Sequence, residues 1–120
     1  MDNKKQMTAR SRYNSFGFAI KGILALLKQE PNMRIHALAA IIVIVAGFVR
    51  HITSIQWIAI AIAIGIVWIA EAFNTCIEML CDLYSIEYNS KIKFIKDIAA
   101  AGVLIASIIS VVIGIFVFFF

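Results

Sequence analysis

Residues 98–120 read IAAAGVLIASIISVVIGIFVFFF, an apolar run of 23 residues in which Ser107 and Ser110 are the polar members. About 20 apolar residues in an α-helix are enough to span the hydrocarbon core of a bilayer. Two further apolar stretches, residues 35–49 and 57–70, precede this run. The sequence therefore predicts an all-α membrane protein with three transmembrane helices. The predicted transmembrane helices cover residues 32–50, 56–84 and 94–120.

The composition agrees with this class. Of the 120 residues, 62% are hydrophobic and 15% are charged, and the mean hydropathy is +0.94. A chain of this length forms one domain, so we expect a single membrane-embedded domain over residues 1–120. The first fifteen residues are polar and basic and do not have the pattern of a secretory signal peptide.

Apolar residues recur at helical spacing between residues 13 and 30, and two lysines fall on the other side of such a helix. The apolar residues are Phe16, Ile20, Ile23, Leu24 and Leu27, and the lysines are Lys21 and Lys28. A basic amphipathic helix of this kind lies in the membrane surface more readily than it crosses the bilayer. We therefore predict an N-terminal amphipathic surface helix over residues 13–30, preceded by a flexible basic N-terminus over residues 1–12.

Pro31, the only proline of the chain, follows this helix. The residue before a proline is disfavoured in the helical region, so Glu30 is expected at a bend. Asn32 is the predicted N-cap of the first transmembrane helix.

The basic residues lie almost entirely on one side of the predicted helices. Ten of the eleven lysines and arginines precede the first apolar stretch, residues 35–49, or lie between the second and the third, whereas Arg50 lies between the first and the second. The positive-inside rule then predicts a cytoplasmic N-terminus and a C-terminus outside the membrane. Because the charges border the predicted helices in this way, the net charge of +4 does not indicate nucleic-acid binding.

The second predicted transmembrane helix contains the segment EAFNTCIEMLCD, residues 71–82. At 100° per residue, Glu71, Asn74, Glu78 and Asp82 fall within an arc of about 80° and form one polar stripe. An ionised group at the centre of a membrane helix costs roughly 2.5–3.5 kcal/mol on insertion scales, so such groups are functional by default. The stripe is therefore predicted to belong to a site.

The stripe ends at the level of further charged residues, which are Glu30, Glu87, Lys96 and Asp97. Carboxylate and amide oxygens are the ligands that Mg²⁺ prefers, usually together with phosphate oxygens, and a lysine pairs with phosphate. The deepest carboxylate, Glu71, is placed to act as a base on a group buried in lipid. A metal, a lysine and a positioned base are the components of phosphoryl transfer, here to an alcohol at the membrane interface. A P-loop motif is absent from the sequence.

Other interpretations remain open at this stage. Intramembrane carboxylates also occur in ion-coupled transporters, and Asn74 alone could serve as a contact between helices. A non-catalytic assembly subunit is a third alternative. His36 and His51 have no partners at ligand spacing along the chain, and Cys76 and Cys81 are interpreted as small hydrophobic residues, so none of the four is expected to bind a metal.

The segment EAFNTCIEMLCDLYSIEYNSKIKFIKDIAAAGVLI, residues 71–105, resembles the signature of the bacterial integral-membrane diacylglycerol kinase family. The matching pattern is E-x-x-N-T/S-x-I-E-x-x-x-D, then E-Y, then A/I-K-D-x-x-A-A. The resemblance extends over the whole chain, beginning at SFGFAIKGI, residues 15–23. It implies an ATP-dependent lipid kinase of the bacterial inner membrane, with three transmembrane helices, a surface helix and a homotrimeric assembly.

The resemblance also implies roles for individual residues. The position of Glu71 is that of the catalytic base on the lipid hydroxyl, and the positions of Glu30 and Glu78 hold the divalent metal, Mg²⁺, together with ATP. The residues at nucleotide-site positions are Glu87, Tyr88, Asn89, Lys96 and Asp97, with Phe18 in place of an aromatic residue near the nucleotide. Asn74 and Asp82 match active-site positions whose roles stay open. Ser11 stands where enterobacterial enzymes have an arginine, and Arg10 or Arg12 is the expected substitute.

The family includes diacylglycerol kinases and undecaprenol kinases. In NMRIHALAA, residues 32–40, His36 stands where the diacylglycerol enzymes tend to have a glutamate, and the RIH sequence resembles the undecaprenol branch. The resemblance therefore favours undecaprenol as the lipid substrate. Diacylglycerol, which would give phosphatidic acid, is the alternative.

Overall fold

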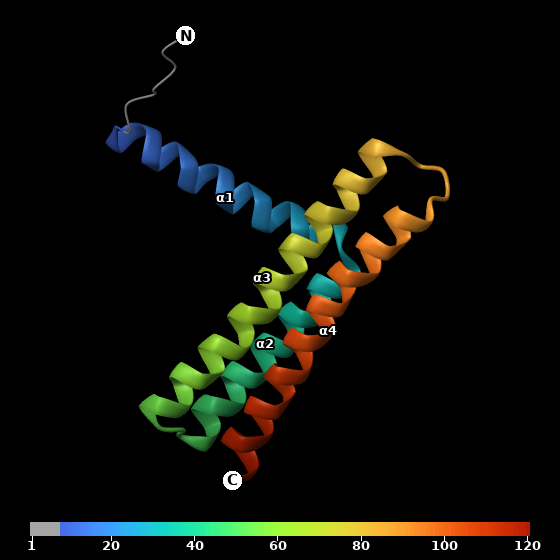
Figure 1. The fold of residues 1–120 in the computed structure, drawn as a ribbon. Coiled ribbons are helices and arrows are strands. Elements are labelled where there is room, and N and C mark those ends of the chain that lie inside the picture. Colours follow the sequence, from blue (N-terminus) through green and yellow to red (C-terminus); the bar gives the residue numbers. More distant parts are fainter. Residues whose placement is uncertain (1–7) are drawn as a thin grey trace.

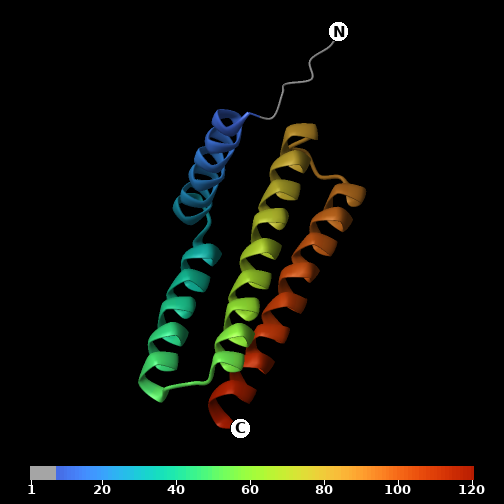
Figure 2. The same cartoon turned by 90° about the vertical axis from the view of Figure 1, so that its left-hand side faces the viewer.

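A computed structural model of the protein describes residues 8–120, which form four helices (Figure 1). These are α1 (Ala9–Gln29), α2 (Pro31–Arg50), α3 (Ser54–Tyr84) and α4 (Ser90–Phe119). Helices α2, α3 and α4 lie side by side, and α1 projects from the bundle at the start of α2 (Figures 1 and 2). Each of the three bundle helices is long and apolar enough to cross a membrane, which confirms the all-helical fold and the number of predicted transmembrane helices.

The two ends of the bundle differ in what they contain. Helix α1 and the loop between α3 and α4 lie at one end, while the α2–α3 connection and the C-terminus lie at the other (Figures 1 and 2). Along α3, Trp57 lies in the first turn and Tyr84 is the last residue, so these aromatic residues lie at opposite ends of the longest helix. Aromatic residues are enriched at both membrane–water interfaces, and their placement here fits a helix that spans the bilayer.

Three of the helices begin earlier than their apolar runs, because polar residues cap them. Thr8 precedes α1 and accepts a hydrogen bond from the Ser11 backbone N–H. Thr53 forms a reciprocal capping box with Gln56 at the start of α3, and Asn89 accepts hydrogen bonds from two backbone N–H groups at the start of α4. Side-chain caps satisfy the backbone donors that a helix start leaves unpaired. Residues 9–12, predicted as flexible, are therefore helical, while residues 1–7 of that prediction lie outside the described residues.

The bend between α1 and α2 lies at Glu30, and the prediction that Asn32 caps α2 is wrong. Glu30 occupies the N-cap position with extended dihedral angles, and Pro31 is the first helical residue. Proline suits this position because its fixed φ is compatible with a helix and its missing N–H would be unpaired there. Arg34 of α2 stabilises the bend, because its Nε and Nη2 atoms donate to the carbonyl oxygens of Leu27 and Lys28 in α1, each at 3.1 Å.

Helix α3 contributes most of the buried residues, and they follow one face. Ile60, Ala63, Val67 and Glu71 are buried at a spacing of three or four residues, so the buried carboxylate continues the apolar contact face. Helix α4 is attached to this face by Ser110, whose hydroxyl donates to the Ala63 carbonyl at 2.7 Å. Most large apolar side chains point outward, as expected where the surroundings are lipid.

Gly47 of α2 lies against the side chain of Trp57 on α3. A Cβ atom at Gly47 would lie 2.6 Å from Cη2 of Trp57, which is closer than real Cβ atoms approach a neighbour. The indole ring also packs against Phe48, with the ring centroids 4.8 Å apart. The absent side chain of Gly47 therefore allows the α2–α3 hairpin to close.

We expect Gly47→Ala to lower the free energy of unfolding by about 1–3 kcal/mol, because a rigid ring must move to admit the methyl group. Unfolding in detergent micelles, followed by far-UV circular dichroism, measures this loss. Gly65→Ala is the matched control, since an added Cβ there meets no atom within 4 Å and alanine is the better helix former. Equal unfolding midpoints for the two variants would contradict the prediction.

Candidate active site

Glu71 is the buried carboxylate of the bundle, and it contacts another helix. Its side chain is 2% exposed, and its Oε1 atom lies 3.0 Å from Nε2 of His36 on α2. An ionised carboxylate can only accept hydrogen bonds, so the Nε2–H of His36 is the donor to that form of Glu71. The imidazole itself is 24% exposed. The pair satisfies one oxygen of a carboxylate whose burial without a partner would be costly.

The contact between His36 and Glu71 is one part of the site that the sequence did not predict. The helical periodicity placed Glu71 on a face of its own helix, but it did not show which residue of α2 lies opposite. One sequence signal was available, because His36 is the polar residue within the apolar stretch 35–49. A polar side chain at membrane depth needs a partner, and a buried carboxylate is a suitable one.

Asn74 and Glu78 lie next along α3, one and two turns beyond Glu71. The Nδ2 atom of Asn74 donates to Oε1 of Glu78 at 3.4 Å, and both residues are half-buried. The Oδ1 atom of Asn74 and the Oγ1 atom of Thr75 are buried and have no hydrogen-bond partner among residues 8–120. Buried polar atoms are almost always paired in proteins, so each of these oxygens is available to a partner from outside the described residues.

Lys96 of α4 contacts the last residue of the polar stripe on α3. Its Nζ atom lies 2.7 Å from Oδ1 of Asp82, whereas Asp97 pairs with Lys93 at the same distance. Neighbouring residues on a helix diverge by 100°, so Lys96 and Asp97 face different partners although they are adjacent in sequence. Both ion pairs are solvent-exposed, and exposed pairs contribute little stability. A phosphate group can therefore replace Asp82 as the partner of Lys96 at small cost.

The other predicted site residues lie around this end of the bundle. Glu30 is half-buried at the α1–α2 bend, and Glu87 and Tyr88 are exposed in the loop between α3 and α4. The side-chain oxygen of Asn89 is already used as the N-cap of α4. Phe18 is exposed on α1, where the Nζ atom of Lys21 lies 6.0 Å from the centre of its ring.

The donor set fits a magnesium ion that arrives with a nucleotide. Among residues 8–120, no three histidine, cysteine, aspartate or glutamate side chains come together as a metal cluster. Mg²⁺ usually takes only one or two carboxylates and completes its shell with phosphate oxygens and water. Glu78, with the unpartnered Asn74 oxygen beside it, offers oxygen ligands of this kind. These oxygen atoms are of the kind that Mg²⁺ takes when it binds together with phosphate groups.

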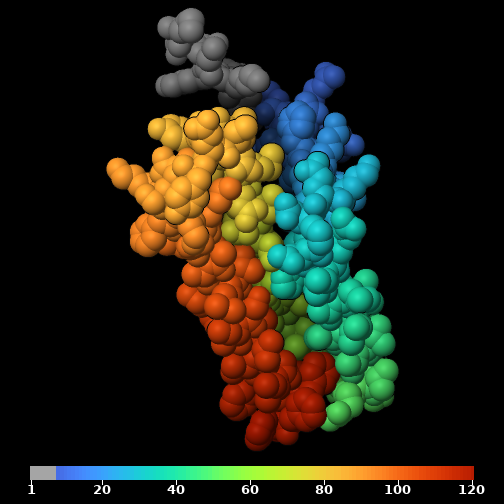
Figure 3. Space-filling model, turned by 90° about the vertical axis from the view of Figure 1, so that its right-hand side faces the viewer, coloured from blue at the N-terminus to red at the C-terminus, as the bar shows by residue number. Residues whose placement is uncertain are grey.

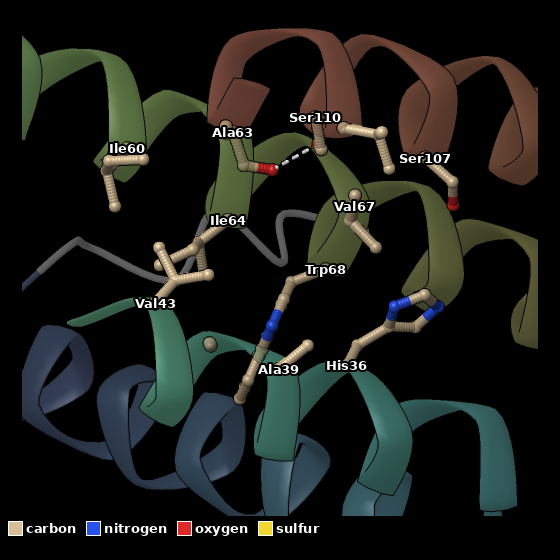
Figure 4. Close-up of a pocket in the computed structure, with 13 residues that line it drawn as sticks. His36, Ala39, Val43, Ile60, Ala63, Ile64, Val67, Trp68, Ser107 and Ser110 are labelled. Carbon is tan, nitrogen blue, oxygen red and sulfur yellow. Dashed lines mark hydrogen bonds between the residues drawn. The ribbon is translucent and has the colours of Figure 1, made fainter. Parts of the chain in front are cut away.

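A cavity of about 280 Å³ lies between α2, α3 and α4 and reaches His36 (Figure 4). Its walls are mainly alanine, valine and isoleucine side chains, and Trp68, Ser107 and Ser110 also line it. Because His36 also contacts Glu71, the buried carboxylate lies just beyond one end of an apolar cavity. This arrangement can bring an apolar molecule with a polar end to a carboxylate base.

Comparison with known proteins agrees with the chemistry of the site. A family model described as prokaryotic diacylglycerol kinase matches residues 17–118. The undecaprenol kinase of Bacillus subtilis (strain 168) is 34% identical over 119 residues, which are 98% of this chain and 97% of that protein. The diacylglycerol kinase of Synechocystis sp. (strain ATCC 27184 / PCC 6803 / Kazusa) is 34% identical over 101 residues, which are 83% of this chain and 58% of that protein.

These matches cover nearly the whole chain, and they include residues 71–82, which contain the buried carboxylate and the polar stripe. The membrane helices and the row of acidic residues are also what a kinase acting on a lipid requires. This chain belongs to the prokaryotic diacylglycerol kinase family and is a lipid kinase that transfers phosphate to an alcohol.

Proposed function

We propose that the protein uses ATP and Mg²⁺ to phosphorylate undecaprenol, a single-chain polyprenol alcohol, at the membrane surface. The proposal rests above all on Glu71, which is buried, bonded to His36 and located just beyond one end of an apolar cavity. It is also supported by the Bacillus subtilis relative, which is named undecaprenol kinase and matches along almost its full length. Phosphorylation of diacylglycerol is the second candidate, supported by the name of the Synechocystis relative.

Glu71 is the proposed general base. Its carboxylate accepts the proton of the lipid hydroxyl while the hydroxyl oxygen attacks the γ-phosphorus of ATP. The bond between that phosphorus and the bridging oxygen of the leaving ADP breaks, and the products are ADP and the lipid phosphate. His36 occupies Oε1 of Glu71. We assign the other oxygen, Oε2, to the lipid hydroxyl, so that His36 fixes the direction in which the base faces.

Glu30 and Glu78 are the proposed magnesium ligands, and Mg²⁺ would neutralise charge on the phosphates during transfer. Asn74 orients Glu78 through the hydrogen bond between their side chains, and Asp82 holds Lys96 until a phosphate replaces it. The proposed ATP-binding residues are Phe18, Glu30, Glu78, Glu87, Tyr88, Asn89, Lys96 and Asp97.

The membrane setting follows from the charges. We propose that α1 lies on the cytoplasmic surface of the bacterial inner membrane, with the N-terminus in the cytoplasm and the C-terminus outside. The bundle end that contains α1 and the α3–α4 loop holds most of the basic residues, which supports this orientation. ATP would then reach the site from the cytoplasm. A homotrimer is the proposed assembly.

The test compares the two lipids directly. Purified protein is incubated with γ-labelled ATP, Mg²⁺ and either undecaprenol or dioleoylglycerol in mixed micelles, and kcat/KM is measured for each. We expect the larger value for undecaprenol. A larger value for dioleoylglycerol would favour the second candidate, and ATP-independent ion uptake into proteoliposomes without lipid phosphorylation would favour a transporter.

His36 gives a sharper test of how the base is positioned. We expect His36→Leu to lower kcat by up to about 100-fold, because a displacement of the base by about 1 Å costs this much, while KM for ATP stays unchanged. His36→Gln retains an N–H donor near the position of Nε2 and should restore much of kcat. Equal kcat values for the leucine and glutamine variants would show that His36 does not act through its hydrogen bond to Glu71.

A further inference from the structure

Helix α4 ends at the side of the bundle opposite α1, against the connection between α2 and α3. Figure 3 shows the end of α4, in red, packed beside this connection, in green. The last four carbonyl groups of a helix have no partner within the helix. The last turn of α4 also contains no basic residue that would compensate the negative end of the helix dipole. The partners for this end of α4 come instead from the α2–α3 hairpin.

Two side chains of the hairpin donate to the end of α4. The Nη2 atom of Arg50, the last residue of α2, donates to the carbonyl oxygen of Phe118 at 3.1 Å. The Nε2 atom of Gln56, in the first turn of α3, donates to the carbonyl oxygen of Val117 at 3.3 Å. Gln56 is half-buried, so its bond is partly protected from water, whereas Arg50 is exposed. Arg50 and Gln56 together form an anchor pair for the end of α4.

The side-chain amide of Gln56 bonds to two helices at once. Its Oε1 atom accepts from the backbone N–H of Thr53 at 2.9 Å, as part of the capping box of α3, while its Nε2 atom donates to α4. The acceptor and the donor of an amide lie in one rigid plane. Both bonds together therefore restrict how far the end of α4 can shift along the start of α3.

A second attachment lies midway along the two helices and is less specific. The Ser110 hydroxyl lies 2.7 Å from the Ala63 carbonyl oxygen of α3 and 2.9 Å from the Ala106 carbonyl oxygen of its own helix. A hydroxyl has one hydrogen to donate, so these two acceptors compete for it. One shared hydrogen bond leaves a helix able to rotate and tilt about that point. The anchor pair at the end of α4 removes this freedom.

The opposite end of α4 contains Lys96. Helix α4 is continuous, so a shift along its axis or a rotation about it at Val117 also displaces Lys96, roughly 30 Å away at the helical rise per residue. The Nζ atom of Lys96 pairs with Asp82 of α3 at 2.7 Å. Because this ion pair joins two helices, it depends on the position of α4 relative to α3.

We propose that Arg50 and Gln56 are positioning residues of the kinase, which hold the end of α4 and thereby set the place of Lys96 at the nucleotide end of the bundle. The consequence for ATP rests on the proposed function, in which Lys96 pairs with a phosphate group. The anchor pair lies at the opposite end of the bundle from the polar stripe, so it acts through Lys96 and not on the reacting groups.

Gln56→Glu breaks the anchor while it keeps the cap of α3. An ionised glutamate still accepts from the Thr53 N–H, as in the usual capping box, but it cannot donate to the Val117 carbonyl. Thr53→Ala is the matched control, because it removes the other half of the capping box and leaves the bond from Gln56 to α4 in place. Arg50→Leu breaks the second anchor bond, and Arg50→Lys retains a donor and the charge.

The reactivity of Lys96 reports the position of α4 without ATP or lipid. Folded protein in micelles is treated with trace acetic anhydride, and the acetylation rates of Lys96 and Lys93 are compared by mass spectrometry. Lys93 is the internal reference, because its carboxylate partner lies on α4 itself. We expect Gln56→Glu to raise the ratio of the Lys96 rate to the Lys93 rate by up to about fivefold, the factor that an exposed ion pair contributes. Arg50→Leu should act in the same direction, whereas Thr53→Ala and Arg50→Lys should leave the ratio unchanged.

A double-mutant cycle tests whether the anchor pair acts on catalysis through Lys96. We expect Gln56→Glu to lower kcat/KM for ATP by up to about 100-fold, and by no more than Lys96→Ala does, because a small displacement of a positioned group can cost this much. In a protein that already carries Lys96→Ala, the addition of Gln56→Glu should cause no further loss. A merely structural role of Gln56 would instead multiply the two losses.

Two results would overturn the proposal. One is an equal ratio of Lys96 to Lys93 acetylation in the Gln56→Glu and Thr53→Ala proteins, and the other is full multiplication of the losses in the cycle. If Gln56→Glu does not fold, the same comparison between Arg50→Leu and Arg50→Lys decides. A raised acetylation ratio, together with an unchanged kcat/KM for ATP in Lys96→Ala, would support the anchor pair and reject the proposed role of Lys96 toward phosphate.

Discussion

Glu71→Gln should reduce kcat by about 10²–10⁴-fold, the range that general base catalysis contributes. Glutamine has nearly the same shape and can still contact His36, so the helices should pack as before. It cannot accept the proton of the lipid hydroxyl, and the hydroxyl oxygen is then a poor nucleophile toward ATP. Steady-state phosphorylation of undecaprenol in mixed micelles measures the loss.

The KM for ATP and the thermal unfolding midpoint provide the controls for this variant. Both values should stay close to those of the unmodified protein. Glu71 lies at the end of the polar stripe that is farthest from the proposed nucleotide-binding residues, and glutamine has nearly the same shape. A Glu71→Gln protein with full activity would refute the assignment of the base. A variant that fails to fold would instead show that the carboxylate is needed for packing, and Glu71→Asp, which retains a carboxylate on a shorter side chain, then tests the catalytic role.

Glu78→Gln has the second largest expected effect, and it acts at the nucleotide end. Changes to residues that merely orient a metal ligand cost 10–100-fold in metal affinity, so loss of a ligand charge should raise the Mg²⁺ concentration needed for half-maximal rate by at least about tenfold. KM for ATP should rise with it, since Mg²⁺ and the phosphates bind together. Titration of activity with Mg²⁺ at several ATP concentrations measures both effects.

Two related variants identify the origin of this effect. Glu78→Asp keeps the charge on a shorter side chain and should fall between the unmodified protein and Glu78→Gln. Cys76→Ala changes an exposed side chain on the opposite face of α3 without removing a charge and should leave the Mg²⁺ dependence nearly unchanged. An unaltered Mg²⁺ requirement in Glu78→Gln would place the metal elsewhere and would leave Glu78 as a partner of Asn74 only.

The number of membrane helices was predictable because length and hydropathy determine it directly. The helix starts were less predictable, since Thr53 and Asn89 extend α3 and α4 with polar, capped turns that hydropathy does not detect. Pro31 indicated the bend, but its preference for the first helical position made Glu30 the N-cap instead of Asn32.

Within the site, the sequence predicted which residues share a face but not which residues meet. Periodicity placed the polar residues of α3 on one stripe, and α3 is a continuous helix through all of them. The contacts of His36 with Glu71 and of Lys96 with Asp82 join residues 35 and 14 positions apart. Such contacts depend on how two helices are rotated and shifted against each other, and the pattern within one helix does not contain that information.

The tight connection between α2 and α3 has a consequence for biosynthesis. Residues 51–53 join the two helices, and Trp57 packs against Gly47 beside this connection. The two helices can therefore enter the membrane as a hairpin while α4 is still being translated. His36 and Glu71 both belong to this hairpin, so the acid–imidazole pair can form before synthesis is complete. Helix α4 is synthesised last, so the wall that it adds to the cavity and the Lys96 side chain complete the candidate site only at that final step.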